Sequence, residues 1–347
     1  MPLYDRLADL PLRVASVDRD RHRRDTSSGF ERTTTTFVLA GGGERGRGED
    51  VTYETADHEA LEGVAFDDLS GEWTLDSFSR HVGERDCFPA KPPEREDFRH
   101  YRRWALESAA LDLALRQADT SLAAALDRNP SPVRFVASTR LDGGDPARVR
   151  EFLAASPALE FKLDPTPEWT AETFDALRET GAVRILDLKG HYEGTTVDQA
   201  PDPELYERVF DLPDAVVEDP AITDATREVV GRNRERVSWD APITGVESVE
   251  ALPFEPSWLN VKPSRFGSVR ALLETLEWAD ERDVALYGGG QFELGVGRRH
   301  VQLLAALFYP DGPNDVAPPV YNDPGVPDDP PTSPLPAPTN STGLSWE

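Results

Sequence analysis

Four short apolar, β-branched runs between residues 183 and 267 constrain the fold of this chain more than any other feature of its sequence. They read VRILD, AVVE, VSWD and LNVK, and they end at the charged residues Asp187, Glu218, Asp240 and Lys262. Segments with helical character fill the intervals, so the pattern predicts repeated βα units with a charge wherever a strand passes into a loop. In a (β/α)8 barrel these transitions converge on one rim, which is where active sites lie.

The carboxylates of this series predict a site for a divalent metal ion. Asp187, Glu218 and Asp240 supply hard oxygen ligands of the kind that Mg²⁺ prefers, with Mn²⁺ as an alternative. A metal that chelates a substrate carboxylate stabilises the negative charge that develops when the neighbouring carbon loses a proton. Any one of these acids could equally be a solvated loop residue, but three at successive strand ends favour a metal site.

Lysine is rare in this chain. Among 37 basic residues there are four lysines, Lys91, Lys162, Lys189 and Lys262, and the rest are arginine. Lysine differs from arginine in that it can lose its proton near neutral pH when its surroundings lower its pKa. Three of the four stand at predicted strand ends, so we interpret Lys162, Lys189 and Lys262 as candidate catalytic residues. Nearby cations, including the metal, are expected to lower the pKa of such a lysine.

The βα pattern begins near Val133 and defines the barrel. VRFVASTRL and LEFKLD read as its first two strands, VALYGGG reads as the seventh, and a weak eighth strand is expected at Asn314–Ala317. In a closed barrel of eight strands, the second and the sixth are four apart and face each other across the mouth. Lys162 and Lys262 are therefore predicted to approach one substrate from opposite sides.

Residues 1–125 lack this pattern and predict a separate capping domain. Leu12–Asp18 and Thr33–Ala40 read as strands, the basic stretch between them reads as a loop, and Phe98–Gln117 reads as a long helix with a packed apolar stripe. The complete prediction is an α/β protein with three parts: an α+β capping domain at 1–125, a (β/α)8 TIM-type barrel at 126–321, and a Pro-rich C-terminal tail at 322–347 that returns to the cap.

Bulk composition limits the partners. The net charge of −27 argues against binding to nucleic acid or to an anionic membrane. Cys87 is the only cysteine, which excludes an internal disulfide and thiolate metal sites. The sequence has no apolar run of membrane-spanning length and no signal peptide at its start, so a cytoplasmic protein is expected. The expected partner is a small carboxylate substrate, and the sequence is compatible with a homo-oligomer.

These segments resemble the enolase superfamily, most closely its muconate-cycloisomerase-like branch. That branch includes o-succinylbenzoate synthases, N-acylamino acid racemases and dipeptide epimerases. LNVKPSRFGSVRALLETLEWA is similar to the branch's sixth-strand lysine segment, YGGGQFELGVGRRHVQLLAAL to its seventh strand and the following helix, and VVEDPA to its fourth-strand metal ligand. In the cap, GRGED resembles a Gly-x-Gly-Glu turn, and WALESAALDLAL resembles the helix that leads to the barrel.

The resemblance carries roles over to particular residues. It implies that Asp187, Glu218 and Asp240 bind Mg²⁺ and that Lys262 acts as an acid or base. It also places Thr26–Phe30 in a mobile cap loop that shapes specificity. The implied reaction removes the proton next to a substrate carboxylate to give an enediolate. This then racemises or epimerises, closes a ring, or loses a leaving group by β-elimination, as in isomerases and lyases of this superfamily.

Two positions depart from the branch. Its second strand carries Lys-x-Lys, where this chain has Lys162 followed by Asp164, and its third strand carries Asp-x-Asn, where this chain has Lys189 at the asparagine place. Lys189, paired with Asp164, could deliver an ammonium near the position of the missing lysine. Alternatively, Lys162 is itself the second lysine and the alignment is shifted. The alternative function is a catalytically degenerate barrel that only binds a metal or a ligand.

Overall fold

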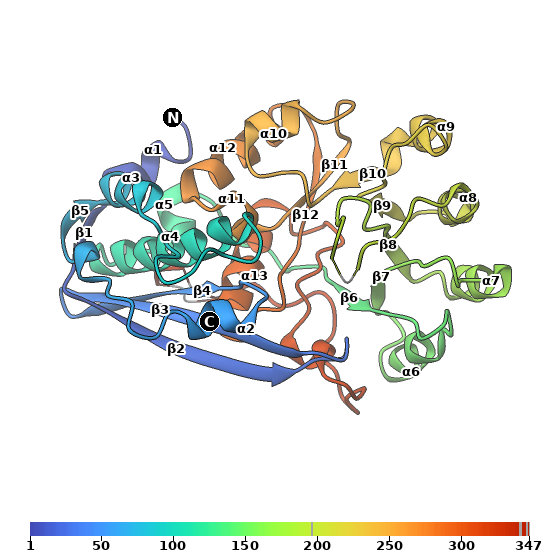
Figure 1. Ribbon diagram of the computed structural model, residues 1–347, viewed down its shortest axis with the longest axis horizontal. Helices are drawn as coiled ribbons and strands as arrows, with labels where there is room; N and C mark the ends of the chain where they lie inside the picture. The colour runs from blue at the N-terminus through green and yellow to red at the C-terminus, as the bar shows by residue number, and fades with distance from the viewer. Residues whose placement is uncertain (196, 340–341, 345, 347) are drawn as a thin grey trace.

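A computed structural model describes residues 1–195, 197–339, 342–344 and 346 of the chain. It has two parts: an N-terminal part with antiparallel sheets and a long helix, and a C-terminal part with a parallel sheet surrounded by helices (Figure 1). This mixed α/β architecture confirms the predicted fold class of a TIM-type barrel with an α+β cap.

The cap contains two antiparallel sheets and the helices that pack on them. One sheet has the order β2-β3-β4 and the other pairs β1 with β5. The strands are β1 (Pro11–Val14), β2 (Ser16–Asp25), β3 (Glu31–Gly41), β4 (Glu44–Asp50) and β5 (Gly71–Thr74). The helices are α1 (Asp5–Ala8), α2 (Thr55–Glu59), the 3₁₀ turn η1 (Asp67–Leu69), α3 (Leu75–Glu84), α4 (Phe98–Gln117) and α5 (Leu122–Leu126).

The basic stretch that was expected to be a loop is mostly a strand, so that prediction was wrong. β2 runs from Ser16 to Asp25 and pairs residue by residue with β3, from Ser16 opposite Ala40 to Asp25 opposite Glu31. Most of its side chains are exposed, because it lies at the edge of the sheet. Its strand conformation therefore depends on backbone pairing with the β-branched β3, which its own charged sequence does not signal.

Helix α4 has the bounds that the sequence predicted, and it packs directly against β4. The Gly-rich turn makes this contact possible. A Cβ atom on Gly46 would lie 2.2 Å from the carbonyl oxygen of Ala109, and one on Gly48 would lie 2.0 Å from that of Ala105. Only glycine at these two positions lets the strand lie against the backbone of the helix.

The barrel strands are parallel and follow one another in chain order. The sheet has the order β12-β11-β10-β9-β8-β7-β6. The strands are β6 (Val136–Thr139), β7 (Glu160–Leu163), β8 (Val183–Asp187), β9 (Val216–Glu218), β10 (Val237–Trp239), β11 (Trp258–Val261) and β12 (Ala285–Gly288).

The expected eighth strand is a two-residue segment that closes the barrel. Asn314 bridges to Phe135 on one side, and Asp315 bridges to Gly289 on the other, both in parallel. The amide of Val136 donates to the Asn314 carbonyl at 2.8 Å, and the amide of Asp315 donates to the Gly288 carbonyl at 2.8 Å. Backbone hydrogen bonds therefore continue from β12 through this segment to β6, at the place where the sequence signal was weakest.

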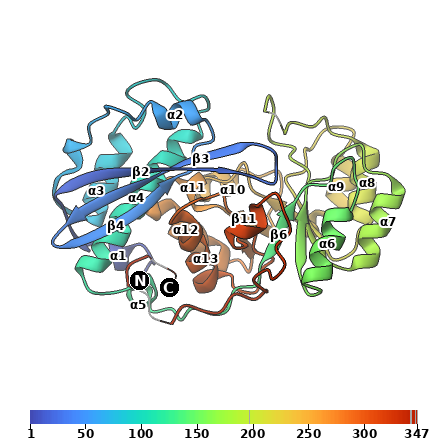
Figure 2. The same cartoon turned by 90° about the horizontal axis from the view of Figure 1, so that it is seen from below.

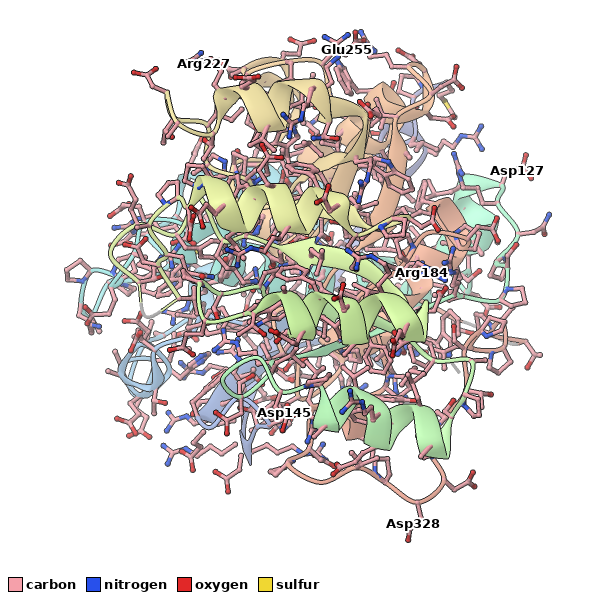
Figure 3. All side chains as sticks on the ribbon, turned by 90° about the vertical axis from the view of Figure 1, so that its right-hand side faces the viewer. Asp127, Asp145, Arg184, Arg227, Glu255 and Asp328 are labelled. Atoms are coloured by element: carbon pink, nitrogen blue, oxygen red, sulfur yellow. The ribbon has the colours of Figure 1, made fainter. Side chains whose placement is uncertain are left out.

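Helices surround the barrel, and α6 to α9 lie together on the side away from the cap (Figures 1 and 2). Charged side chains such as Arg227 and Glu255 project from this side into solvent (Figure 3). The helices are α6 (Ala147–Ala155), α7 (Ala171–Thr180), α8 (Pro203–Asp211), α9 (Arg227–Arg232), η2 (Arg234–Arg236), α10 (Val246–Glu250), α11 (Pro263–Phe266), α12 (Val269–Asp280), α13 (Gly297–Phe308) and η3 (Pro319–Asn322).

Two apolar clusters hold this arrangement together. A small cluster of Val136, Ile185, Val216 and Tyr287 comes from four different strands and fills the inside of the barrel. A much larger cluster lies between the strands and helices and continues into the cap. The barrel is thus a packed core, and polar side chains on the inward faces gather above the small cluster.

Residues near the C-terminus contact the cap helices. The amide of Leu122 donates to the Gly343 carbonyl at 3.1 Å, and the amide of Leu344 donates to Asp112 at 2.8 Å. Leu344 and Trp346 pack on the main core, while Ser345 and Glu347 lie outside the described residues. No helix in the described part of the chain is long and apolar enough to cross a bilayer.

Candidate active site

The structure places the predicted site residues at one end of the barrel. Asp187 and Glu218 are the last residues of β8 and β9, and Asp240 and Lys262 directly follow β10 and β11. The three carboxylates are completely buried, and Lys262 is 6 % exposed. Parallel strands end at a common rim, which is why residues spaced along 75 positions of sequence (187 to 262) gather in one place.

Lys162, on β7, bridges two of the predicted metal ligands. Its Nζ lies 2.6 Å from Glu218 Oε1, 3.1 Å from Asp187 Oδ2 and 3.8 Å from Asp315. Burial alone would lower the pKa of Lys162, but Glu218 and Asp187 outweigh it and raise the pKa well above its ordinary value. These two carboxylates therefore keep Lys162 protonated. The sequence led us to expect a lowered pKa for this lysine, and the surrounding side chains instead raise it.

Asp240 is surrounded by donors from two other loops. Its Oδ2 accepts hydrogen bonds from Lys262 Nζ at 2.8 Å and from the Tyr192 hydroxyl at 3.0 Å. Arg265 donates to both of its oxygens, at 2.9 and 3.2 Å, and also to the Tyr192 hydroxyl at 2.7 Å. Although burial would raise the pKa of Asp240, Arg265 and Lys262 hold it well below its usual range.

Lys189 lies in the loop after β8 and contacts Asp187, as an ion pair with its Oδ2. Its Nζ is also 3.5 Å from Asp164, which directly follows β7 and forms a second ion pair with Arg140 at 3.2 Å. The structure therefore brings Lys189 and Asp164 together, as the sequence hypothesis required.

The carboxyl groups of Glu218 and its neighbour Asp219 both have raised pKa values. Burial first, and then Asp187, raise the pKa of Glu218 to about 8, even though Lys162 opposes the shift. Burial and Asp240 raise the pKa of Asp219 to about 7. Asp219 points into the loop after β10, where the amides of Asp240 and Ala241 donate to it at 2.8 and 2.9 Å. The Asp219 carboxylate therefore holds the backbone of the loop after β10 and does not contact the lysines of the site.

Sequence reasoning missed several buried members of this cluster. Asn260 and Tyr287 donate to Glu218 Oε2 at 3.1 and 2.6 Å. The alternation of side chains along a strand was a signal for Asn260, which lies two residues before Lys262 and so shares its inward face. Arg265 lies on the four-residue helix α11 and Tyr192 lies in a loop, and neither segment has a periodicity that would mark a residue as inward-facing.

The donor set fits a magnesium ion by chemistry and by charge. In the part of the chain that the structure describes, no three acidic, histidine or cysteine residues stand ready to hold a metal, because chain donors occupy the carboxylate oxygens. The acids and bases of this cluster nevertheless differ in number. Six carboxyl groups meet five cationic side chains: Asp164, Asp187, Glu218, Asp219, Asp240 and Asp315 against Lys162, Lys189, Lys262, Arg265 and Arg140. A bound cation would offset this excess of acids, and oxygen ligands suit Mg²⁺.

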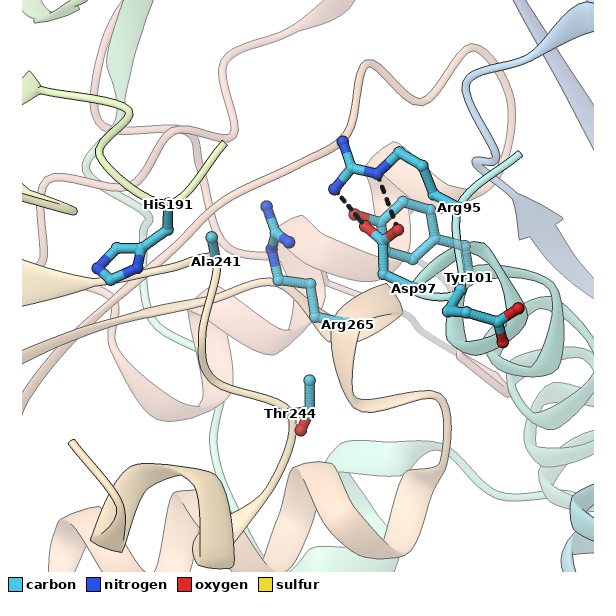
Figure 4. Close-up of a pocket in the computed structure, with 8 residues that line it drawn as sticks. Arg95, Asp97, Tyr101, His191, Ala241, Thr244 and Arg265 are labelled. Atoms are coloured by element: carbon cyan, nitrogen blue, oxygen red, sulfur yellow. Dashed lines mark hydrogen bonds and ion pairs between the residues drawn. The ribbon is translucent and has the colours of Figure 1, made fainter. Parts of the chain in front are cut away.

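A cavity of about 400 Å³ adjoins Arg265 at the boundary between cap and barrel. Cap residues Arg95, Asp97 and Tyr101 line one side of it, and two barrel residues, His191 in the loop after β8 and Arg265 on α11, line the other (Figure 4). Arg95 pairs with Asp97 through two hydrogen bonds of 3.0 and 2.9 Å, drawn as dashed lines in Figure 4. The cap therefore contributes a wall to the space beside the site.

The cap also contacts the rim through the tip of its β2–β3 hairpin, which reaches across to the barrel (Figure 2). Thr26–Phe30 forms this tip. The Phe30 ring packs edge-on against Phe292 in the loop after β12, with ring centroids 5.6 Å apart. Below it, Glu49 is buried and accepts hydrogen bonds from the amides of Leu294, Gly295 and Gly297 at the start of α13. These contacts fix the cap against the barrel mouth.

Comparison with known proteins supports this architecture. Two family models match the sequence. One is described as the domain of unknown function (DUF8230) C-terminal domain and matches residues 129–323, and the other is its N-terminal domain and matches residues 5–125. A search of the curated proteins finds no match to this sequence.

Solved structures of the enolase superfamily are similar over most of the chain. A dipeptide epimerase from Methylococcus capsulatus, complexed with Mg and the dipeptide L-Arg-D-Lys, has a TM-score of 0.68 at 21 % identity and covers 88 % of this chain and 90 % of its own. Muconate lactonizing enzyme from Pseudomonas putida has a TM-score of 0.64 at 17 % identity, with 88 % of each chain covered. An unknown superfamily member from Enterococcus faecalis V583 has a TM-score of 0.66 at 18 % identity, covering 88 % and 86 %. These similarities confirm the predicted fold, a barrel with a capping domain.

Proposed function

The chain belongs to the DUF8230 family and has the fold of the enolase superfamily, and on this premise we propose that it is an enzyme that removes the proton next to a substrate carboxylate. The subsequent step is racemisation or epimerisation, cycloisomerisation, or β-elimination. The solved neighbours named as an epimerase and a lactonizing enzyme support this general reaction type.

One observation carries the proposal: two buried lysines reach the same group of carboxylates from strands four apart in the barrel. Lys162 comes from β7 and Lys262 from the end of β11, and their ammonium groups contact Glu218 and Asp240. Acid–base chemistry on the two faces of one carbon requires such an arrangement. Three of the four lysines lie in this cluster, in a chain where 33 of the 37 basic residues are arginine.

The lysines perform the proton transfers in this proposal. To act as the base, Lys262 first gives up its ammonium proton to solvent. It then accepts the proton from the carbon next to the carboxylate, and the electron pair of the broken C–H bond moves into the carboxyl group to form an enediolate. Lys162, which its carboxylates hold as an ammonium, then returns a proton to the opposite face, or the electron pair expels a leaving group. In the reverse direction the two lysines exchange roles.

Asp187, Glu218 and Asp240 are the residues that would hold Mg²⁺, or Mn²⁺ in its place. When bound, the ion supplies positive charge that stabilises the developing negative charge on the substrate. Asn260 and Tyr287 support this role, because their hydrogen bonds hold Glu218 in place.

The two charged residues of the unusual second strand lie on the same face of β7. Lys162 and Asp164 are two residues apart and both contact groups at the mouth, whereas Leu163 between them packs in the main core. Asp164 therefore shares the inward face with Lys162, which is compatible with both alignments of this strand. Lys189 is the nearby ammonium, which keeps it as a third candidate catalytic residue.

Exchange of the substrate α-proton with D₂O tests the proposal. The substrate panel would contain acyl amino acids, dipeptides and cyclohexadiene carboxylates, and the exchange would be followed by NMR with and without EDTA. We expect exchange that EDTA abolishes and that falls at least about 100-fold in Lys162→Ala and Lys262→Ala, as for loss of an acid–base group.

Lys91→Ala is the matched control, because Lys91 pairs with Asp57 and Glu94 in the cap, away from the barrel. It should leave exchange unchanged. If Lys189→Ala keeps full turnover while Lys162→Ala loses it, Lys189 has no catalytic role. Absence of exchange across the whole panel, with metal binding retained, would support the alternative of a degenerate barrel that only binds a metal or ligand.

A further inference from the structure

Lys189 stands between two carboxylates that lie on different strands. Its ammonium contacts Asp187 at the end of β8 and lies 3.5 Å from Asp164 at the end of β7. The Lys189 side chain is 14 % exposed, whereas that of Asp187 is completely buried. A displacement of only an ångström or so would thus transfer the ammonium from the inner acid to the outer one.

The backbone holds Lys189 over Asp187 in an unusual conformation. Its φ of +55° lies in the left-handed region, which costs a non-glycine residue of this kind about 1 kcal/mol. Its amide donates to Asp187 Oδ1 at 3.1 Å, and the amide of Gly190 donates to the Asp219 carbonyl at 2.8 Å. A Cβ atom on Gly190 would lie 2.2 Å from the amide nitrogen of Ala221, so the loop packs directly against the backbone that follows β9. The turn is built to keep this ammonium at the metal-ligand carboxylate.

Asp187 has two ammonium groups, those of Lys162 and Lys189, next to the same carboxylate oxygen. Lys162 already lies 3.1 Å from the oxygen that Lys189 contacts, and Lys162 is held by Glu218 as well. Asp164 is in the opposite situation, because its other cation, Arg140, is 49 % exposed and so interacts weakly. If Lys189 leaves Asp187, Asp187 still has Lys162 as a counter-ion. Asp164 then gains the Lys189 ammonium as a well-placed counter-ion.

We propose that Lys189 is an internal counter-cation that occupies Asp187 until a divalent metal binds and then transfers to Asp164. The inference rests on the proposed function and deepens it by naming the residues that set metal affinity. A metal must compete with the Lys189 ammonium for Asp187 Oδ2, so this lysine weakens metal binding. Asp164 offsets part of that competition because it receives the displaced ammonium.

Titration calorimetry with Mg²⁺ alone, and the Mn²⁺ paramagnetic resonance signal, measure this competition without reference to catalysis. Lys189→Met removes the charge and keeps the length of the side chain, so it should bind both ions at least about tenfold more tightly than the native chain. Asp164→Asn should weaken binding several-fold when Lys189 is present. In the Lys189→Met background the same change should have little effect, because no displaced ammonium needs a partner.

Asp315→Asn is the matched control for the loss of a nearby carboxylate. Asp315 is 18 % exposed and 3.8 Å from Lys162, but it forms no ion pair with Lys189 among the described residues. Its effect on affinity should be the same with Lys189 and with methionine at that position. Melting temperatures give a second readout. Without metal, Lys189→Met should melt at a lower temperature than the native chain, and addition of Mg²⁺ should raise its melting temperature by more than it raises that of the native chain. Lys189→Gln provides a second neutral variant should Lys189→Met fold poorly.

The outcomes separate the inference from the proposed function. Equal metal affinity in the native chain and in both neutral variants would overturn the role of Lys189 and leave the metal-dependent function standing. Tighter binding in Lys189→Met with equal effects of Asp164→Asn in both backgrounds would overturn the transfer to Asp164. No binding of Mg²⁺ or Mn²⁺ by any variant would overturn both the inference and the metal-dependent function.

Discussion

His300 is a buried histidine whose two ring nitrogens have no hydrogen-bond partner among the described residues. It lies on α13 and is 1 % exposed. Burial lowers its pKa from 6.5 to about 4; Asp112 and Glu293 oppose this shift and Arg116 adds to it. A neutral imidazole is therefore enclosed in the core, and protonating it would place an unpaired charge there.

This predicts a specific loss of stability in mild acid. Because the folded-state pKa is depressed, the contribution of the neutral ring is complete above pH 6.5 and is lost as the pH falls toward 4. The full difference corresponds to roughly 3 kcal/mol, of which about 2 kcal/mol is already lost at pH 5. His300→Leu removes the titrating group and two unpartnered nitrogens. We expect it to match or exceed native stability at pH 8 and to exceed it by about 2 kcal/mol at pH 5.

Urea unfolding of both proteins at several values between pH 5 and pH 8 measures the difference. Other titrating groups are common to both chains, so they cancel when the two free energies of unfolding are subtracted. His300→Gln separates titration from packing, because it keeps a polar side chain but does not titrate, and it should show the same flattened pH dependence as leucine. The reasoning is refuted if the native chain and His300→Leu lose equal stability between pH 8 and pH 5.

Two further predictions concern the contacts around the barrel mouth. Glu49→Ala leaves three amides at the start of α13, one of them buried and two partly buried, without their acceptor and should lower the free energy of unfolding by about 2–4 kcal/mol. Glu44→Ala, at an exposed position of the same strand, should change it by less than ~0.5 kcal/mol, and comparable losses in urea unfolding would contradict the role of Glu49. In Gly289→Ala, the new Cβ would lie 2.6 Å from Asn260 Oδ1 and 2.7 Å from Lys262 Cε. Displacement of the lysine should slow α-proton exchange by up to ~100-fold while the protein stays folded, and unchanged exchange would argue against Lys262 as the base.

The strength of each sequence inference followed from how local its signal was. Helix α4 was predicted with its observed bounds because its apolar side chains recur at helical spacing within one segment. The strands that carry Asp187, Glu218 and Asp240 were found because buried parallel strands are short apolar runs that end at a rim. β2 was misread as a loop, because its conformation comes from pairing with β3 and its own charged residues give no strand signal.

The eighth strand also has almost no local sequence signal. Asn314 and Asp315 complete the barrel with two parallel bridges, although two residues are too few to produce a sequence pattern. Their place was expected only because seven βα units imply an eighth. Asp315 consequently reaches the vicinity of Lys162, a contact that no reading of the local sequence could have indicated.

By itself, the sequence determined the barrel, its cap and the strand ends at which acids and lysines appear, because those depend on periodicity and spacing along the chain. Only the tertiary structure decided which charge meets which: Lys162 with Glu218, Arg265 with Asp240, and Lys189 between Asp187 and Asp164. The physical reason is that these pairings form across strands and loops far apart in sequence. Burial makes each of them matter, because inside the barrel a carboxylate without a counter-ion would not keep its charge.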